Sequence, residues 1–121
     1  GKLFCVVGCG GDRDPGKREP MGRAAAEAAD VVIVTDDNPR SEVPEAIRAA
    51  VLAGARHGAR DGVRVIDGGE RRAAIAAALE LADPSDWVAI LGKGHETGQT
   101  IGDRVWPFDD VEVVRDLARR K

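Results

Sequence analysis

The stretch Leu3–Gly8 (LFCVVG), with the loop that continues it, Gly8–Gly16 (GCGGDRDPG), decides the fold class of this chain. An unbroken apolar run that ends in glycine is typical of a strand buried in a parallel sheet. The loop is rich in glycine and contains Pro15, so it is not expected to be helical. Arg18–Ala29 then shows a helical pattern rich in alanine. This order of strand, polar loop and helix predicts the first unit of an α/β fold.

The same order recurs along the rest of the chain. The further strands that we expect are Val31–Val34, Val63–Ile66 and Trp87–Leu91, and the further helices are Pro44–Leu52, Glu70–Leu81 and Asp109–Arg120. Near the end, Gln99–Ile101 and Arg104–Trp106 flank Gly102-Asp103, which is the two-residue turn expected of a β-hairpin. The sequence therefore predicts a mostly parallel sheet flanked by helices, with a C-terminal β-hairpin.

Length and composition limit the classes of function. The 121 residues suit a single domain, 1–121, and the core is built from Val, Ile, Leu and Ala. The net charge of −3 argues against non-specific nucleic-acid binding, which needs a basic excess. No apolar run approaches the roughly 20 residues needed to span a bilayer, and nothing resembles an export leader. Two cysteines are too few for a disulfide framework, so we expect a cytoplasmic protein.

Three polar, glycine-bearing loops follow the carboxyl ends of predicted strands. They are Gly8–Lys17, Asp36–Arg40 and Gly92–Glu96. Ligands bind at this edge in open α/β sheets, so we expect the functional site where these loops lie.

The first loop contains Gly11–Lys17 (GDRDPGK), which has the glycine and lysine spacing of a phosphate loop. Arg18 stands where that motif needs Ser or Thr as a Mg²⁺ ligand, so a free-standing nucleotide hydrolase is the less favoured alternative. The acids and bases of this loop fit either an anion site at a helix N-terminus or a solvated loop with mutual ion pairs. A pure interaction module is a third possibility.

The second loop, Asp36–Arg40 (DDNPR), combines carboxylates for an amine with a guanidinium for a carboxylate. That set matches a zwitterionic amino acid, although an ordinary turn capping the next helix has the same composition. The third loop, Gly92–Glu96 (GKGHE), offers backbone N–H groups, a carboxylate and an imidazole. It lacks the second histidine of a zinc-protease motif, and we expect no metal ligands in the chain. His57, in the predicted connection Ala53–Gly62, is expected to be solvated.

In this order and spacing, the three motifs resemble the C-terminal domain of the diaminopimelate-adding Mur ligases, the UDP-N-acetylmuramoyl-tripeptide synthetases of peptidoglycan synthesis. Lysine-adding relatives carry a different residue in place of the arginine of Asp37–Arg40. The resemblance implies a Rossmann-like fold that holds the incoming amino acid. The residues that it implies bind meso-2,6-diaminopimelate are Arg13, Asp37, Asn38, Pro39, Arg40, Gly92 and Glu96. Asp14 and Lys17 are expected near the ATP phosphates.

In that family, ATP and Mg²⁺ are used to phosphorylate the D-glutamyl carboxylate of UDP-MurNAc-L-Ala-D-Glu, and the amine of diaminopimelate then attacks the acyl phosphate. The products are the amide, ADP and phosphate, and the pathway serves cell wall biogenesis, cell shape and cell division. The family's own phosphate loop, carbamylated lysine and UDP-sugar domain have no counterpart within 1–121. We therefore expect a domain excised from a three-domain enzyme, with no catalytic residue of its own and no activity alone. ATP and Mg²⁺ would be bound mainly by the absent central domain.

Overall fold

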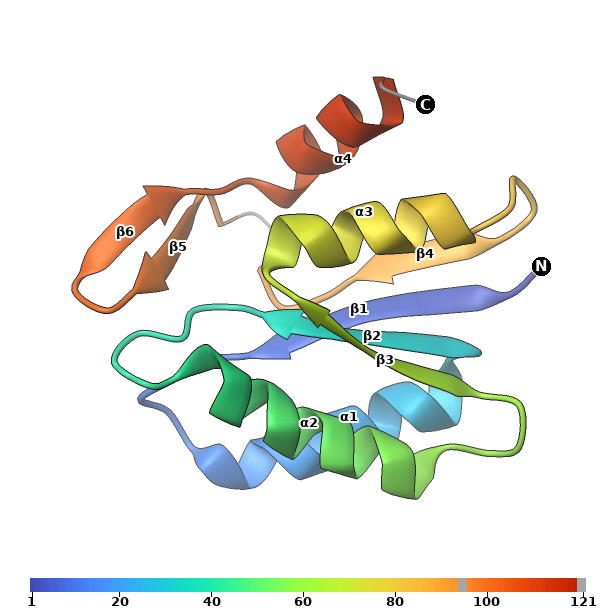
Figure 1. The fold of residues 1–121 in the computed structure, drawn as a ribbon, viewed down its shortest axis with the longest axis horizontal. Helices are drawn as coiled ribbons and strands as arrows, with labels where there is room; N and C mark the ends of the chain where they lie inside the picture. Colours follow the sequence, from blue (N-terminus) through green and yellow to red (C-terminus); the bar gives the residue numbers. More distant parts are fainter. Residues whose placement is uncertain (94–95, 120–121) are drawn as a thin grey trace.

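A computed structural model describes residues 1–93 and 96–119 (Figure 1). The elements in chain order are β1 (Leu3–Cys9), a 3₁₀ turn η1 (Pro15–Lys17), α1 (Arg18–Ala28), β2 (Val31–Asp36), α2 (Pro44–Gly58), β3 (Arg64–Gly69), α3 (Arg71–Leu81), β4 (Trp87–Ile90), β5 (Gly98–Ile101), β6 (Arg104–Pro107) and α4 (Asp110–Arg119). The predicted alternation of strands and helices is confirmed.

Four strands form one sheet in the order β3-β2-β1-β4, and every pair in it is parallel. In the central strand, Val6 is aligned with Ile33 on one side and Ile90 on the other. The pair β5–β6 forms a separate antiparallel hairpin with its turn at Gly102-Asp103. The predicted fold class is therefore confirmed.

Helices cover both faces of the sheet, with α1 and α2 on one side and α3 and α4 on the other (Figure 1). Side chains of a strand alternate between its two faces, so β1 contributes to two cores. Cys5 and Val7 pack towards α1 and α2, whereas Phe4 and Val6 pack towards α3 and α4. No helix within the described residues is long and apolar enough to cross a membrane.

The helices α1 and α2 pack closely because glycines face the partner helix. A Cβ on Gly22 would lie 2.0 Å from the Val51 carbonyl oxygen, and one on Gly54 would lie 2.0 Å from the Glu19 carbonyl oxygen. This packing explains why α2 continues past the predicted end at Leu52, even though glycine is a weak helix former.

Three local predictions need correction. His57 lies inside α2, not in a connection, and its Nδ1 is 3.2 Å from the Glu19 carboxylate. The loop after β1 contains one 3₁₀ turn, because Asp14 accepts a hydrogen bond from the Gly16 N–H and Pro15 suits a first turn. The strand β3 continues through Gly69, beyond the predicted end at Ile66, because the Thr35 hydroxyl donates to the Gly69 carbonyl at 2.8 Å.

Candidate functional site

The three polar loops meet at the carboxyl edge of the sheet, as expected from parallel strands. The Gly11 N–H donates to the Asn38 carbonyl at 2.7 Å and so joins the first loop to the second. Gly92 begins the third loop with a φ of +113°, a conformation that favours glycine. A Cβ at Gly92 would lie 3.6 Å from the Gly8 carbonyl oxygen and 3.8 Å from the Asp37 carboxyl carbon, so the third loop lies against the other two.

A pocket of about 320 Å³ lies at this meeting point. It is lined by Gly8, Cys9, Gly10, Arg13, Asp14, Lys17, Met21, Asp37 and Gly92. Three of these residues, Arg13, Asp37 and Gly92, are predicted to contact the amino acid. Two others, Asp14 and Lys17, are predicted to lie near ATP. One pocket therefore brings members of both predicted groups together, whereas the remaining predicted residues are not among those that line it: Asn38, Pro39, Arg40 and Glu96.

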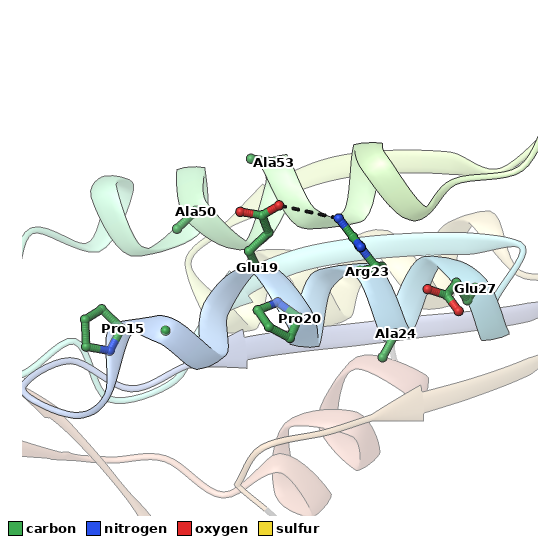
Figure 2. A pocket seen from close by; sticks show the side chains of 9 residues that line it. Pro15, Glu19, Pro20, Arg23, Ala24, Glu27, Ala50 and Ala53 are labelled. Carbon is green, nitrogen blue, oxygen red and sulfur yellow. Dashed lines mark ion pairs between the residues drawn. The ribbon is translucent and has the colours of Figure 1, made fainter.

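A larger pocket, of about 580 Å³, lies along α1 and the middle of α2 (Figure 2). Its walls include Pro15, Pro20 and Ala53, and the Glu19–Arg23 ion pair along α1 is 3.7 Å long with both side chains half exposed. It contains none of the predicted site residues. The smaller pocket is therefore the better candidate site, because it lies where the loops that follow the carboxyl ends of the strands meet.

Arg40 connects the first loop, the second loop and the hairpin. Its Nη1 donates to the Gly11 carbonyl at 2.8 Å and lies 2.8 Å from where a Cβ on Gly10 would be. Its own N–H donates to the Thr100 carbonyl at 3.0 Å, and its carbonyl accepts from the Gly102 N–H. These contacts hold Arg40 at a φ of +54°, which is unfavourable for a residue with a side chain.

Pro39 and Asp12 hold the backbone on either side of this arginine. Pro39 is fully buried, and its carbonyl would clash with a Cβ on Gly11 at 1.9 Å, so glycine is required for this close approach. The Asp12 carboxylate accepts hydrogen bonds from the N–H and the hydroxyl of Ser41. These bonds lower the pKa of Asp12 below its ordinary value. Pro39 therefore fixes the backbone next to Arg40 and does not line the pocket.

Asp37 has a carboxylate oxygen that is only partly satisfied. Its Oδ1 is buried without a hydrogen-bond partner among the described residues and lies 3.7 Å from the Lys93 Nζ. Burial raises the pKa of Asp37, and the positive charges of Lys93 and Arg71 act against that rise. A buried carboxylate with an unused acceptor is suited to an ammonium ligand.

Asn38 and Glu96 both lie beside Lys93. The Asn38 Oδ1 accepts from the Lys93 Nζ at 3.1 Å and from the Thr100 N–H at 2.8 Å. The Glu96 carboxylate is half exposed and lies 3.8 Å from the same Nζ. Gly94 and His95, which are part of the third sequence motif, lie outside the described residues.

Lys93 and Arg71 are buried cations that the sequence did not predict. Lys93 has no exposed side-chain surface, and Arg71 is 1% exposed. Arg71 donates to both carboxylate oxygens of Asp110, at 2.8 and 2.7 Å, and to the carbonyls of Asp36 and Leu91. It therefore joins the ends of β2 and β4 to α4. A lysine between two glycines and an arginine at a helix start are usually exposed, so neither burial could be inferred from sequence.

The residue that follows the phosphate-loop pattern, Arg18, has a structural role. Arg18 stands at the position of the Mg²⁺-ligating hydroxyl, but its side chain is largely buried and its Nη2 is 2.7 Å from the Glu42 carboxylate. The same Nη2 also donates to the Gly10 carbonyl. These residues do not fit a complete Mg²⁺–ATP site, which disfavours the free-standing hydrolase.

Comparison with known proteins now identifies the class. The family model described as "Mur ligase, glutamate ligase domain" matches residues 1–94, and the chain belongs to this family of Mur ligase C-terminal domains. The resemblance inferred from the three motifs is confirmed.

The names of individual relatives are more specific than the description of the family. The chain is 54% identical over 122 residues to a Corynebacterium efficiens protein named UDP-N-acetylmuramoyl-L-alanyl-D-glutamate–2,6-diaminopimelate ligase, covering 98% of this chain and 23% of that protein. Proteins of the same name from Bradyrhizobium diazoefficiens and Streptomyces coelicolor are 58% and 52% identical, over 93% and 99% of this chain and 22% and 24% of theirs. A solved structure of a ligase of that name matches with a TM-score of 0.85 and 43% identity, over 99% of this chain and 24% of that one. The chain thus spans about a quarter of the length of these relatives.

Proposed function

We propose that this chain is the amino-acid-binding domain of an ATP-dependent ligase that adds meso-2,6-diaminopimelate to UDP-MurNAc-L-Ala-D-Glu. The family and the names of its relatives support a ligase. Residues 1–121 would form one domain of a longer, three-domain enzyme, because the relatives are about four times as long. A cytoplasmic location remains a prediction from composition.

One observation carries the choice of ligand: the 320 Å³ pocket at the sheet edge has both acidic and guanidinium groups. Diaminopimelate carries two ammonium groups and two carboxylates. Asp37 offers an unused buried acceptor for an ammonium group, with Glu96 on the neighbouring loop. Arg13 lines the pocket, and Arg40 lies against Gly10 in its wall, so both guanidinium groups would be available to the carboxylates of the ligand.

The domain's part in the reaction would be to bind and orient the amino acid, so that its reacting amine is held in one place. When bound in the full enzyme, ATP with Mg²⁺ supplies the phosphoryl group that activates the D-glutamyl carboxylate. Asp14 and Lys17 line the same pocket and would lie near the ATP phosphates, where a lysine stabilises developing negative charge. The remaining ATP and Mg²⁺ contacts would come from outside this chain.

Arg40 provides the test of the ligand. Diaminopimelate differs from lysine by one distal carboxylate, and a guanidinium binds a carboxylate through two parallel hydrogen bonds. Truncating one partner of a buried charge pair costs about 2–5 kcal/mol, and about 1.4 kcal/mol is tenfold. In the full-length ligase, Arg40→Ala should therefore raise the KM for diaminopimelate roughly a hundredfold or more and leave the KM for ATP nearly unchanged.

Two further variants make this test specific. Arg40→Lys keeps the charge but loses the planar pair of donors, so it should recover little diaminopimelate use. Arg23→Ala removes an exposed arginine from α1 and should leave both KM values unchanged. Normal turnover of diaminopimelate by Arg40→Ala would contradict the proposed ligand.

A further inference from the structure

Lys93 lies at the centre of the groups proposed to bind the amino acid. Its side chain is fully buried. Its Nζ donates to the Asn38 Oδ1 at 3.1 Å and to the Gly98 carbonyl at 2.6 Å. The same nitrogen lies 3.7 Å from the Asp37 Oδ1 and 3.8 Å from the Glu96 Oε1. A lysine is rarely buried this completely unless its charge is paired, and here its partners belong to the site itself.

We propose that Lys93 is a positioning residue of the diamino-acid site, which fixes the orientation of the Asn38 amide and keeps the Asp37 carboxylate ionised to receive an ammonium group. This inference rests on the proposed function. It assigns to Lys93 no direct contact with the reacting atoms.

The hydrogen bonds determine the orientation of the amide. An amide oxygen has two lone pairs, and on Asn38 they accept from Lys93 and from the Thr100 N–H. A flipped amide would turn its NH₂ group towards two donors, which is unfavourable. The NH₂ group of Asn38 is therefore the part that remains for a ligand. Because NH₂ is a donor, it suits a carboxylate oxygen of the amino acid and not an ammonium group.

The charges determine how many ammonium groups are favoured. Asp37 and Glu96 together carry two negative charges, and Lys93 offsets one of them. The remaining charge suits one ammonium group. The other groups that act on Asp37 are Arg71, Arg40 and the Cys9 thiol. Desolvation and the Glu96 charge both raise the pKa of Asp37, and the Lys93 charge lowers it. Without the Lys93 charge, Asp37 would therefore keep its proton to a higher pH.

The test uses the full-length ligase with Lys93→Gln. Glutamine is one atom shorter and keeps an N–H donor, but it has no charge. We expect the KM for diaminopimelate at pH 7 to rise at least tenfold, with the KM for ATP within twofold of the original enzyme. We also expect the acid limb of the 1/KM profile for diaminopimelate to move to higher pH. Lys2→Gln, an exposed lysine at the far end of β1, should change none of these values.

A purely structural lysine gives a different result. It would lower the melting temperature and raise both KM values together or neither, with the acid limb unmoved, and that outcome would overturn the inference. A wild-type enzyme that does not use diaminopimelate would instead overturn the proposed function, so the two failures are distinct.

Asn38→Asp keeps the inference testable if Lys93→Gln does not fold. Aspartate retains an oxygen for both Lys93 and Thr100 but has no NH₂ group. We expect a folded enzyme whose melting temperature stays within a few degrees of wild type and whose KM for diaminopimelate rises at least tenfold. An unchanged KM for diaminopimelate would overturn the assigned orientation of the amide.

Discussion

At the scale of one residue, the ligand binding proposed for Asp37 conflicts with the stability of the folded chain. Its side chain is 16% exposed, and one carboxylate oxygen is buried with no hydrogen-bond partner among the described residues. Burial raises the pKa of Asp37 despite the nearby cations. The folded chain therefore holds this proton over a pH range in which the unfolded chain has released it. Stability consequently falls as pH rises from the ordinary pKa of 3.8 through the folded-state pKa.

Asp37→Asn should remove the fall in stability that ionisation of Asp37 causes. We expect this chain to melt at a higher temperature than wild type at pH 7, and we expect the difference to disappear below pH 3.8, where both states of the wild type are protonated. Calorimetry across this pH range measures the effect. In the full-length ligase the same change should strongly raise the KM for diaminopimelate. A variant less stable than wild type at pH 7 would show that the Lys93 ion pair outweighs the cost of burial.

Glu96 is expected to affect binding more than stability, because its carboxylate is half exposed. Glu96→Gln in the full-length ligase should raise the KM for diaminopimelate several-fold more than the KM for ATP. The melting temperature should change little, since exposed ion pairs contribute about 0–1 kcal/mol. Equal increases in both KM values would mean that Glu96 serves contact with the rest of the enzyme and not amino-acid binding.

At the scale of elements, α1 and α2 depend on close backbone contact. Alanine normally stabilises a helix by about 1 kcal/mol relative to glycine. At Gly54, however, the added Cβ would lie 2.0 Å from the Glu19 carbonyl oxygen, so the helices must separate. Overpacking of this kind costs about 1–3 kcal/mol. Because α1 carries Met21 of the pocket wall, the separation would also reach the site.

We therefore expect Gly54→Ala to lower the melting temperature of this chain by several degrees, as measured by circular dichroism. The matched control is Ala53→Ser, at the exposed neighbouring position in α2, which should change the melting temperature by much less. A Gly54→Ala chain as stable as wild type would mean that the two helices can shift apart without cost.

At the scale of the whole molecule, the chain should fold but not turn over ATP. The sheet and its two cores are complete enough for a domain of this size. Arg18, at the position of the Mg²⁺-ligating hydroxyl, is engaged with Glu42. In a phosphate-release assay with Mg²⁺ and ATP, we expect this chain to show no activity above background. Activity that Lys17→Ala abolishes would support the nucleotide-hydrolase alternative.

The sequence could predict the architecture of the molecule but only part of its site. Apolar runs followed by polar loops are sufficient to predict a parallel sheet and the edge where Asp37 and Arg40 lie. The extension of α2 could not be predicted, because Gly54 breaks helices in isolation and promotes packing here. The burial of Lys93 and Arg71 could not be predicted either. It depends on partners up to 55 residues away in sequence, which only the tertiary structure brings together.

The left-handed backbone of Arg40 has a consequence for protein engineering. An L-residue in this conformation costs about 1–2 kcal/mol relative to a relaxed one, and glycine or asparagine adopts it more readily. A redesign guided by backbone conformation alone would therefore select Arg40 for replacement by one of these residues. The same replacement would remove the guanidinium proposed to select the diamino acid. Thermostabilised versions of this domain should consequently be screened for substrate selectivity and not only for their resistance to heat.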